Sequence, residues 1–162
     1  MEQIDNNAQT PVSYGGFWKR LAAYILDWII LTIFSIIMLI VFSASFGVLF
    51  GSALSVETFE EGNEAALLGL TLGADLLTFA IAWLYYAGME SSSKQATFGK
   101  LALGMKVTRL NGERISFLRA SVRFFSKLLS VLLFLIGFIM IAFTEKKQGL
   151  HDMIAGVVVV NK

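Results

Sequence analysis

The sequence predicts an all-α polytopic membrane protein that carries a small cytoplasmic β-hairpin. Hydrophobic residues make up 56% of the 162 residues, well above the share in soluble domains. Two apolar stretches, residues 18–43 and 66–87, each reach the roughly 20 residues that a bilayer-crossing helix needs. A third run, residues 128–144, is shorter, and an Asn-Gly pair with alternating neighbours lies in the loop before it. We expect one membrane domain over residues 16–162, preceded by a flexible cytoplasmic tail over residues 1–15.

Composition excludes several classes of site. The chain has no cysteine and one histidine, so neither a disulfide framework nor a multi-histidine metal cluster is expected. The segment 95–100 has a Gly-Lys pair but lacks the spacing of a phosphate loop, and no Gly-x-Ser-x-Gly elbow is present. We therefore expect no metal, no cofactor, no catalytic residue and no enzymatic activity. A net charge of +1 gives no reason to expect nucleic acid as a partner.

The first span begins with a charged pair of unusual placement. Arg20 enters the apolar run and Asp27 follows seven residues later, about 10 Å along the same helix face. An intramembrane carboxylate costs about 2.5–3.5 kcal/mol on insertion scales, so Asp27 should face protein or water. Two helical turns are too long for a direct contact, and each residue is expected to have another partner. Because polar residues precede the run and it is too long for a signal peptide, we expect an uncleaved span.

The second span contains another intramembrane acid, Asp75, and ends in an aromatic belt. Gly69 and Gly73 are four residues apart, a spacing that lets a second helix approach closely. Aromatic side chains at the end of the span are typical of the membrane interface.

The loop over residues 88–127 is strongly basic, which places it in the cytoplasm together with the N-terminus. The connection between the first two spans carries Glu57, Glu60, Glu61 and Glu64 without a Lys or Arg, which places it outside. The location expected is the plasma membrane. The basic residues of the loop are Lys94, Lys100, Lys106, Arg109, Arg114, Arg119, Arg123 and Lys127.

Two elements are expected within this loop. Asn111-Gly112 predicts a hairpin between residues 105–110 and 113–117, because a type I′ turn needs positive φ at both positions. Ser116 can then cap an amphipathic helix. Its basic residues would contact acidic lipid headgroups. These residues are Arg119, Arg123 and Lys127.

The third apolar run, residues 128–144, is at the short limit for a span and contains Gly137. The β-branched run 157–160 could add a third strand to the hairpin, which requires the C-terminus to be cytoplasmic. We therefore favour two full spans and a short re-entrant or broken third element, with three simple spans as the alternative.

Three segments resemble the RDD family of small membrane proteins: residues 17–27, 95–100 and 148–156. The resemblance covers nearly the whole chain from Gly16 to Val160. It assigns the arginine and two aspartates for which the family is named to Arg20, Asp27 and Asp152, which gives the first helix a candidate third partner. Asp75 matches none of these positions. The remaining motif residues are Gln95, Thr97, Gly99, Lys100, His151 and Gly156.

For the last motif, we expect Asp152 to cap or anchor the terminal segment and His151 to lie at the interface, with a proton-handling pair as the alternative. The resemblance implies one of two functions. In the first, an Arg–Asp network stabilises an accessory or regulatory subunit of a membrane protein complex, such as a membrane protease. In the second, Asp27, Asp75 and Asp152 relay ions in a cation/proton antiporter, which would need an oligomer because so few helices cannot enclose a path. The accessory role is favoured, with a membrane protein or a second copy as partner.

Overall fold

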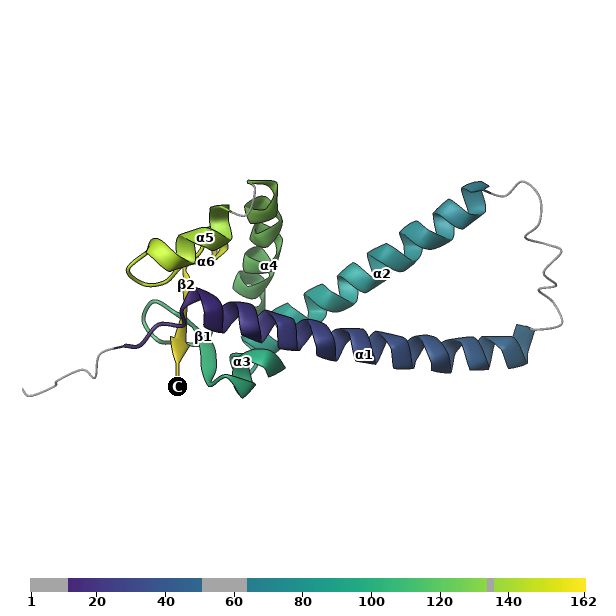
Figure 1. The fold of residues 1–162 in the computed structure, drawn as a ribbon, viewed down its shortest axis with the longest axis horizontal. Helices are drawn as coiled ribbons and strands as arrows, with labels where there is room; N and C mark the ends of the chain where they lie inside the picture. The colour runs from purple at the N-terminus through teal and green to yellow at the C-terminus, as the bar shows by residue number, and fades with distance from the viewer. Residues whose placement is uncertain (1–11, 51–63, 134–135) are drawn as a thin grey trace, which may run out of the picture.

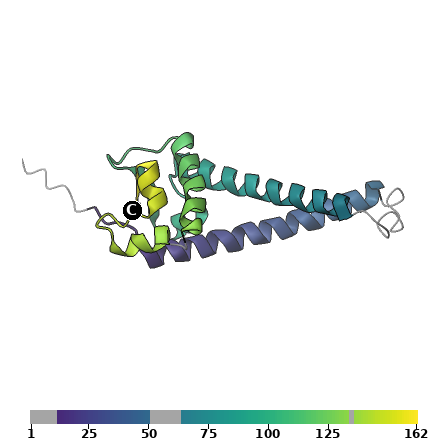
Figure 2. The same cartoon turned by 90° about the horizontal axis from the view of Figure 1, so that it is seen from above.

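The computed structural model describes residues 12–50, 64–133 and 136–162. It is mostly helical, and two long helices project in the same direction from a cluster of shorter elements (Figures 1 and 2). The elements in chain order are α1 (Phe17–Phe50), α2 (Glu64–Ser91), α3 (Phe98–Ala102), β1 (Met105–Arg109), α4 (Phe117–Leu132), α5 (Ile136–Phe143), α6 (Leu150–Ala155) and β2 (Val157–Asn161).

The two long helices are the candidate membrane spans. The apolar segments Phe17–Met38 of α1 and Thr71–Ser91 of α2 are 22 and 21 residues long, which is sufficient to cross a bilayer. Both helices extend beyond the predicted ranges 18–43 and 66–87. The acidic connection expected between them, with Glu57, Glu60 and Glu61, lies outside the described residues, as do residues 1–11 of the expected tail.

The third apolar run does not form one straight helix. α4 begins in the basic segment and ends at Leu132, and α5 begins at Ile136 with its axis turned by 103°. Ser116 caps α4 as predicted, because its hydroxyl accepts a hydrogen bond from Arg119 N–H at 3.3 Å. In both views α4 crosses the direction of α1 (Figures 1 and 2).

The hairpin prediction is wrong in its pairing. Residues 105–109 form β1, but their antiparallel partner is β2, with Met105 opposite Asn161 and Arg109 opposite Val157. Residues 113–116 form no strand, although Gly112 has the positive φ of a turn, 83°. The predicted C-terminal strand is therefore present, in a sheet of two strands.

The edge of β1 away from β2 explains this outcome. Val107 N–H donates there to Gln95 C=O at 2.7 Å, so a returning strand finds this position occupied. Within the described residues, the one backbone hydrogen bond from β1 to the far side of the turn runs from Arg109 N–H to Glu113 C=O. The four consecutive valines of β2 are instead buried on both faces, as expected of a covered strand.

The core lies where the long helices meet the sheet. Buried apolar side chains from both strands pack with small residues of α1, α2, α4 and α6. The chain before α1 also pairs with the sheet, because Tyr14 bridges to Val160 and Gly15 N–H donates to Val159 C=O. The buried residues of this hydrophobic core are Ala23, Ala87, Met105, Val107, Ile115, Ala120, Ala155, Val157 and Val159.

Candidate functional site

Arg20 lies one turn into α1 and is almost fully buried, with 8% of its surface exposed. Its Nε donates to Gly15 C=O at 2.7 Å, and its other guanidinium nitrogens donate to the Asp152 carboxylate and to Lys147 C=O. The planar guanidinium has donors in fixed directions, which suits several acceptors at once. Arg20 therefore joins the start of α1 to the C-terminal segment, 132 residues away.

Asp152 receives these bonds at the N-terminus of α6. One carboxylate oxygen accepts from Arg20 and from Gly149 N–H, which caps the helix, and the other accepts from Arg123 Nε at 2.7 Å. The side chain has no exposed surface. Burial alone would raise the pKa of Asp152, but the charges of Arg123 and Arg20 hold this pKa well below its usual range. Asp152 is therefore ionised at neutral pH.

Arg123 extends the chain of charges to α2. Its NH1 donates to Glu90 at 2.7 Å, and the other oxygen of Glu90 accepts from Lys100. We call Arg20, Asp152, Arg123, Glu90 and Lys100 the charge network; each residue comes from a different helix, in the order α1, α6, α4, α2 and α3. Three cations share two carboxylates, and every member is at least 91% buried.

Lys100 is the cation at the α3 end of the network. Burial lowers the pKa of Lys100 to about 7; Glu90 opposes this shift, and the positive charges of Arg123 and Lys127 add to it. Nearby, Lys127 lies over the Tyr86 ring, with Nζ 4.7 Å from its centroid. These contacts correct the expected lipid patch: Arg123 is 2% exposed and held by two carboxylates, so it cannot face lipid headgroups.

Asp27 forms a second cluster, separate from Arg20. Its carboxylate accepts from Tyr85 OH at 2.8 Å, Thr97 Oγ1 at 2.6 Å and Gly99 N–H at 2.7 Å. A Cβ on Gly99 would lie 2.1 Å from Ala23 C=O, so a glycine permits this approach. Asp27, 1% exposed, is thus satisfied by neutral donors from α2, from α3 and from the N-cap residue of α3.

The segment 95–100 contributes hydrogen-bond donors both to Asp27 and to the charge network. Gln95 adopts a φ of 54° and bonds Val107, Thr97 donates to Asp27, and Lys100 donates to Glu90. Successive side chains thereby connect the sheet, the first span and the second span. Gly99, which lies between Thr97 and Lys100 in the sequence, donates its backbone N–H to Asp27.

Comparison with known proteins shows the family to which the chain belongs. Residues 14–156 match the RDD family. The chain belongs to the RDD family. It is 39% identical over 150 residues to "Uncharacterized protein YxaI" of Bacillus subtilis (strain 168), covering 91% of this chain and 97% of that protein. It is 29% identical over 156 residues to "Uncharacterized membrane protein YteJ" of the same organism, covering 93% and 82% respectively. No solved structure matches it.

In this RDD protein the structure brings Arg20 and Asp152 into contact and gives Asp27 its own partners. Glu90 was missed by sequence reasoning, and its only signal is a lone acid at the end of a span that precedes a basic loop. Asp75 joins neither cluster. It lies on the exposed surface of α2, and within the described residues its carboxylate makes no hydrogen bond or ion pair.

The remaining RDD motif residues close the C-terminal segment. His151 is buried against Phe138, with ring centroids 5.0 Å apart, so its side chain faces protein. Burial lowers the pKa of His151 to about 3, and its Nδ1 has no partner in the described part of the chain. Gly156 ends α6 with a φ of 64°. No group of three or more His, Asp or Glu residues is placed to hold a metal ion within the described ranges.

Proposed function

We propose that this RDD protein is an accessory or scaffolding subunit of a membrane protein complex, and not an enzyme. The observation that carries the proposal is the saturation of its buried carboxylates. Each oxygen of Asp27, Glu90 and Asp152 accepts a hydrogen bond from a protein donor. A group that is fully bonded to its own chain is suited to hold elements in place and has little capacity left for a travelling ion.

The energetics of such a network favour a structural role in assembly. Replacing a whole buried ion pair by apolar residues is often neutral, but removing one partner costs about 3–5 kcal/mol. The network therefore favours one arrangement of the five helices over others. The short helices and the sheet, held in one arrangement at the cytoplasmic end of the two spans, form a surface that a partner subunit would recognise. This partner is either another membrane protein or a second copy.

We place the protein in the plasma membrane, with the N-terminus in the cytoplasm and α4–α5 as a re-entrant element. Three features support this orientation: the basic segment 88–127, the bend of 103° between α4 and α5, and the pairing of the chain before α1 with β2. A re-entrant break is tolerated when its backbone is buried in protein. Here Gly137 is buried, and a Cβ there would lie 2.4 Å from Ser130 Oγ.

The second candidate, cation/proton antiport by an oligomer, rests on two observations. Asp75 is an unpaired carboxylate on the exposed face of a candidate span. Burial lowers the pKa of Lys100 to about 7, so its ammonium group can release and rebind a proton near neutral pH. Lys100 is bonded to Glu90, but in the described residues Asp75 contacts neither the charge network nor Asp27, so no path joins the two groups, and this is why the accessory role is preferred.

One experiment separates the two functions. Wild type, Asp27→Asn and Asp75→Asn are reconstituted in proteoliposomes with an internal pH dye and given a Na⁺ pulse. The accessory role predicts no flux in any of them, a lower melting temperature for Asp27→Asn, and an unchanged one for Asp75→Asn. Wild-type flux that is lost in a well-folded variant would establish transport instead.

The assembly itself is tested by cross-linking in membranes followed by purification under identical conditions. A defined cross-linked species, hetero-oligomeric or homo-oligomeric, should be present in wild type and reduced in Asp27→Asn. The Asp75→Asn variant serves as the matched control, because its carboxylate bonds nothing in the described residues. A monomer in all three samples would contradict the accessory role.

A further inference from the structure

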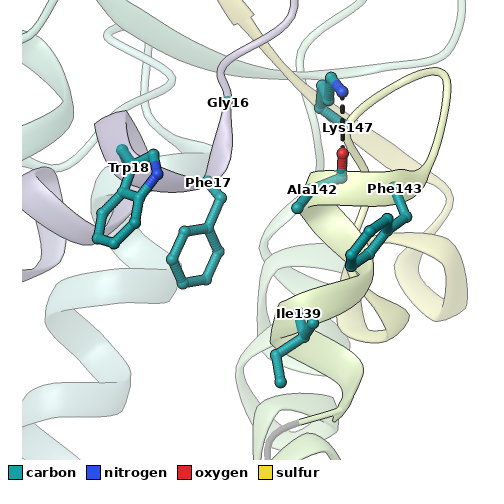
Figure 3. A pocket seen from close by; sticks show the side chains of 7 residues that line it. All are labelled: Gly16, Phe17, Trp18, Ile139, Ala142, Phe143 and Lys147. Atoms are coloured by element: carbon teal, nitrogen blue, oxygen red, sulfur yellow. Dashed lines mark hydrogen bonds between the residues drawn. The ribbon is translucent and has the colours of Figure 1, made fainter.

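A groove of about 460 Å³ lies between the start of α1 and the end of α5. Phe17 and Trp18 form one wall, and Ile139, Ala142 and Phe143 form the other (Figure 3). The lining is almost wholly apolar, and its one charged residue is Lys147. Its volume falls in the range of about 300–1,000 Å³ that is usual for small-molecule sites.

The position of the groove in the chain indicates what environment it faces. Phe17 is the first residue of a candidate membrane span, and Trp18 next to it is 77% exposed. On the opposite wall Phe143 is 83% exposed. Exposed tryptophan at the end of a span is typical of the headgroup level of a bilayer. The apolar walls therefore adjoin the region where acyl chains begin.

Lys147 is held at one end of the groove by two contacts. Its Nζ donates to Ala142 C=O at 3.1 Å, shown dashed in Figure 3, and its own C=O accepts from Arg20. An ammonium group has three donor hydrogens, so two remain for another acceptor. Within the described residues Lys147 has no carboxylate partner, which leaves its charge available.

The backbone of Lys147 adds a second observation. Its φ is 49°, in the left-handed region that glycine and asparagine adopt more readily than lysine. A lysine at this position therefore carries a conformational cost. Such strain at a residue that faces a groove suggests a role for the side chain itself.

We propose that this groove binds one anionic phospholipid, with an acyl chain between α1 and α5 and the phosphate on the Lys147 ammonium group. The apolar walls match a hydrocarbon chain, and the single cation matches a phosphate without a neighbouring positive headgroup. This groove, and not the buried Arg123, is then a point of contact with acidic lipid. Because Arg20 bonds the Lys147 backbone, the bound lipid lies one residue from the charge network.

Trp18 provides the test. In the full chain with Trp28→Phe and Trp83→Phe, Trp18 is the one tryptophan that remains. Its fluorescence is measured in nanodiscs with phosphatidylglycerol or phosphatidylcholine brominated on the acyl chains. We expect half-maximal quenching at a several-fold lower mole fraction of brominated phosphatidylglycerol than of brominated phosphatidylcholine. Equal quenching by the two lipids would overturn the proposal.

Two neighbouring lysines give a matched pair of variants. Lys147→Asn removes the charge with a residue that tolerates positive φ, and Lys146→Asn does the same to an exposed lysine outside the groove. The preference for phosphatidylglycerol should vanish in the first variant and persist in the second. An equal loss in both would indicate general surface charge and reject the site.

Ala142→Phe fills the groove without touching either lysine. It should weaken quenching by both brominated lipids, while the melting temperature stays unchanged. If a second copy of the chain occupies the groove instead, Trp18 is quenched by neither lipid in the parent protein, and Ala142→Phe lowers its oligomeric mass. That outcome contradicts lipid binding.

Discussion

The carboxylate of Asp27 accepts the backbone N–H of Gly99 at 2.7 Å, which brings α3 directly against the first span. The contact is so close that a Cβ on Gly99 would lie 2.1 Å from Ala23 C=O. An acid inside a span is thus satisfied by a backbone group that only a glycine can deliver. Together with the bond from Lys100 to Glu90, this relationship holds the segment 95–100 against both long helices.

Gly99→Ala should destabilise the protein although alanine favours helices. The added methyl meets backbone, so α1 and α3 must separate, and overpacking of this kind costs about 1–3 kcal/mol or more. The measurement is thermal unfolding in detergent by circular dichroism. Gly88→Ala in α2 is the control, since no atom lies within 4 Å of its Cβ, and it should be neutral or stabilising by up to about 1 kcal/mol. Equal melting temperatures for the two variants would refute the contact.

Arg123 is the centre of the charge network, and Arg123→Lys should be nearly as harmful as Arg123→Met. Its Nε and NH1 reach Asp152 and Glu90 at 2.7 Å each, whereas a lysine has one charged atom and cannot occupy both positions. Each of these two buried carboxylates would keep one cation, Arg20 or Lys100, and lose the other, and removing one partner from a buried ion pair costs about 3–5 kcal/mol. Chemical denaturation measures the loss.

The control for Arg123 is a surface pair of similar geometry. Arg109 and Glu113 approach to 2.8 Å, but both side chains are exposed. Arg109→Met should therefore have little measurable effect, because water solvates the remaining carboxylate. A comparable loss in both variants would show that burial does not decide the cost.

His151 should make the protein sensitive to mild acid. Burial lowers its pKa from an ordinary 6.5 to about 3, so the folded state binds fewer protons than the unfolded state between these values. Stability should fall as pH drops below 6.5, by about 1.4 kcal/mol per pH unit. The pKa of Asp152 is also lowered, so its contribution is lost only below about 3.8, where an unperturbed carboxyl titrates.

The check is the melting temperature of wild type and His151→Asn from pH 7 to pH 4. The wild type should lose stability across this window, and the variant, which lacks the imidazole, should lose much less. Parallel curves would mean that another group accounts for the acid sensitivity.

The two spans, the cap at Ser116 and the C-terminal strand were predictable because each depends on local pattern. Apolar length, a hydroxyl before a helix and a β-branched run are all visible within a few residues. The hairpin prediction failed because the group that bonds the outer edge of β1 in place of a returning strand lies elsewhere in the chain. Gln95 occupies the free edge of β1 at Val107, and nothing near Asn111 indicates this.

The charge network shows the same limit more strongly. The pairing of Arg20 with Asp152 was suggested by resemblance, since 132 residues separate the two and no periodicity connects them. Arg123 looked like a surface cation because α4 is amphipathic, yet its side chain is buried by Glu90 and Asp152. Charged residues could be assigned to elements from the sequence, but their partners depended on how five helices converge.

The last prediction concerns the side of the membrane on which the chain ends. Asn161 accepts from Lys19 Nζ at 2.7 Å, so the C-terminus lies beside the start of α1. With the basic segment in the cytoplasm, both should be cytoplasmic. Because the protein has no cysteine, single cysteines at Glu61, Arg114 and Lys162 report on topology without background labelling.

In intact cells an impermeant thiol reagent should label the variant at Glu61 and neither of the others. Lys162 is used because its side chain is exposed and the Asn161 side chain bonds Lys19. Permeabilised cells provide the control, in which all three sites should react. Labelling of Lys162 but not Arg114 in intact cells would mean that α4 and α5 cross the bilayer as a third span, because only an odd number of crossings separates the two positions.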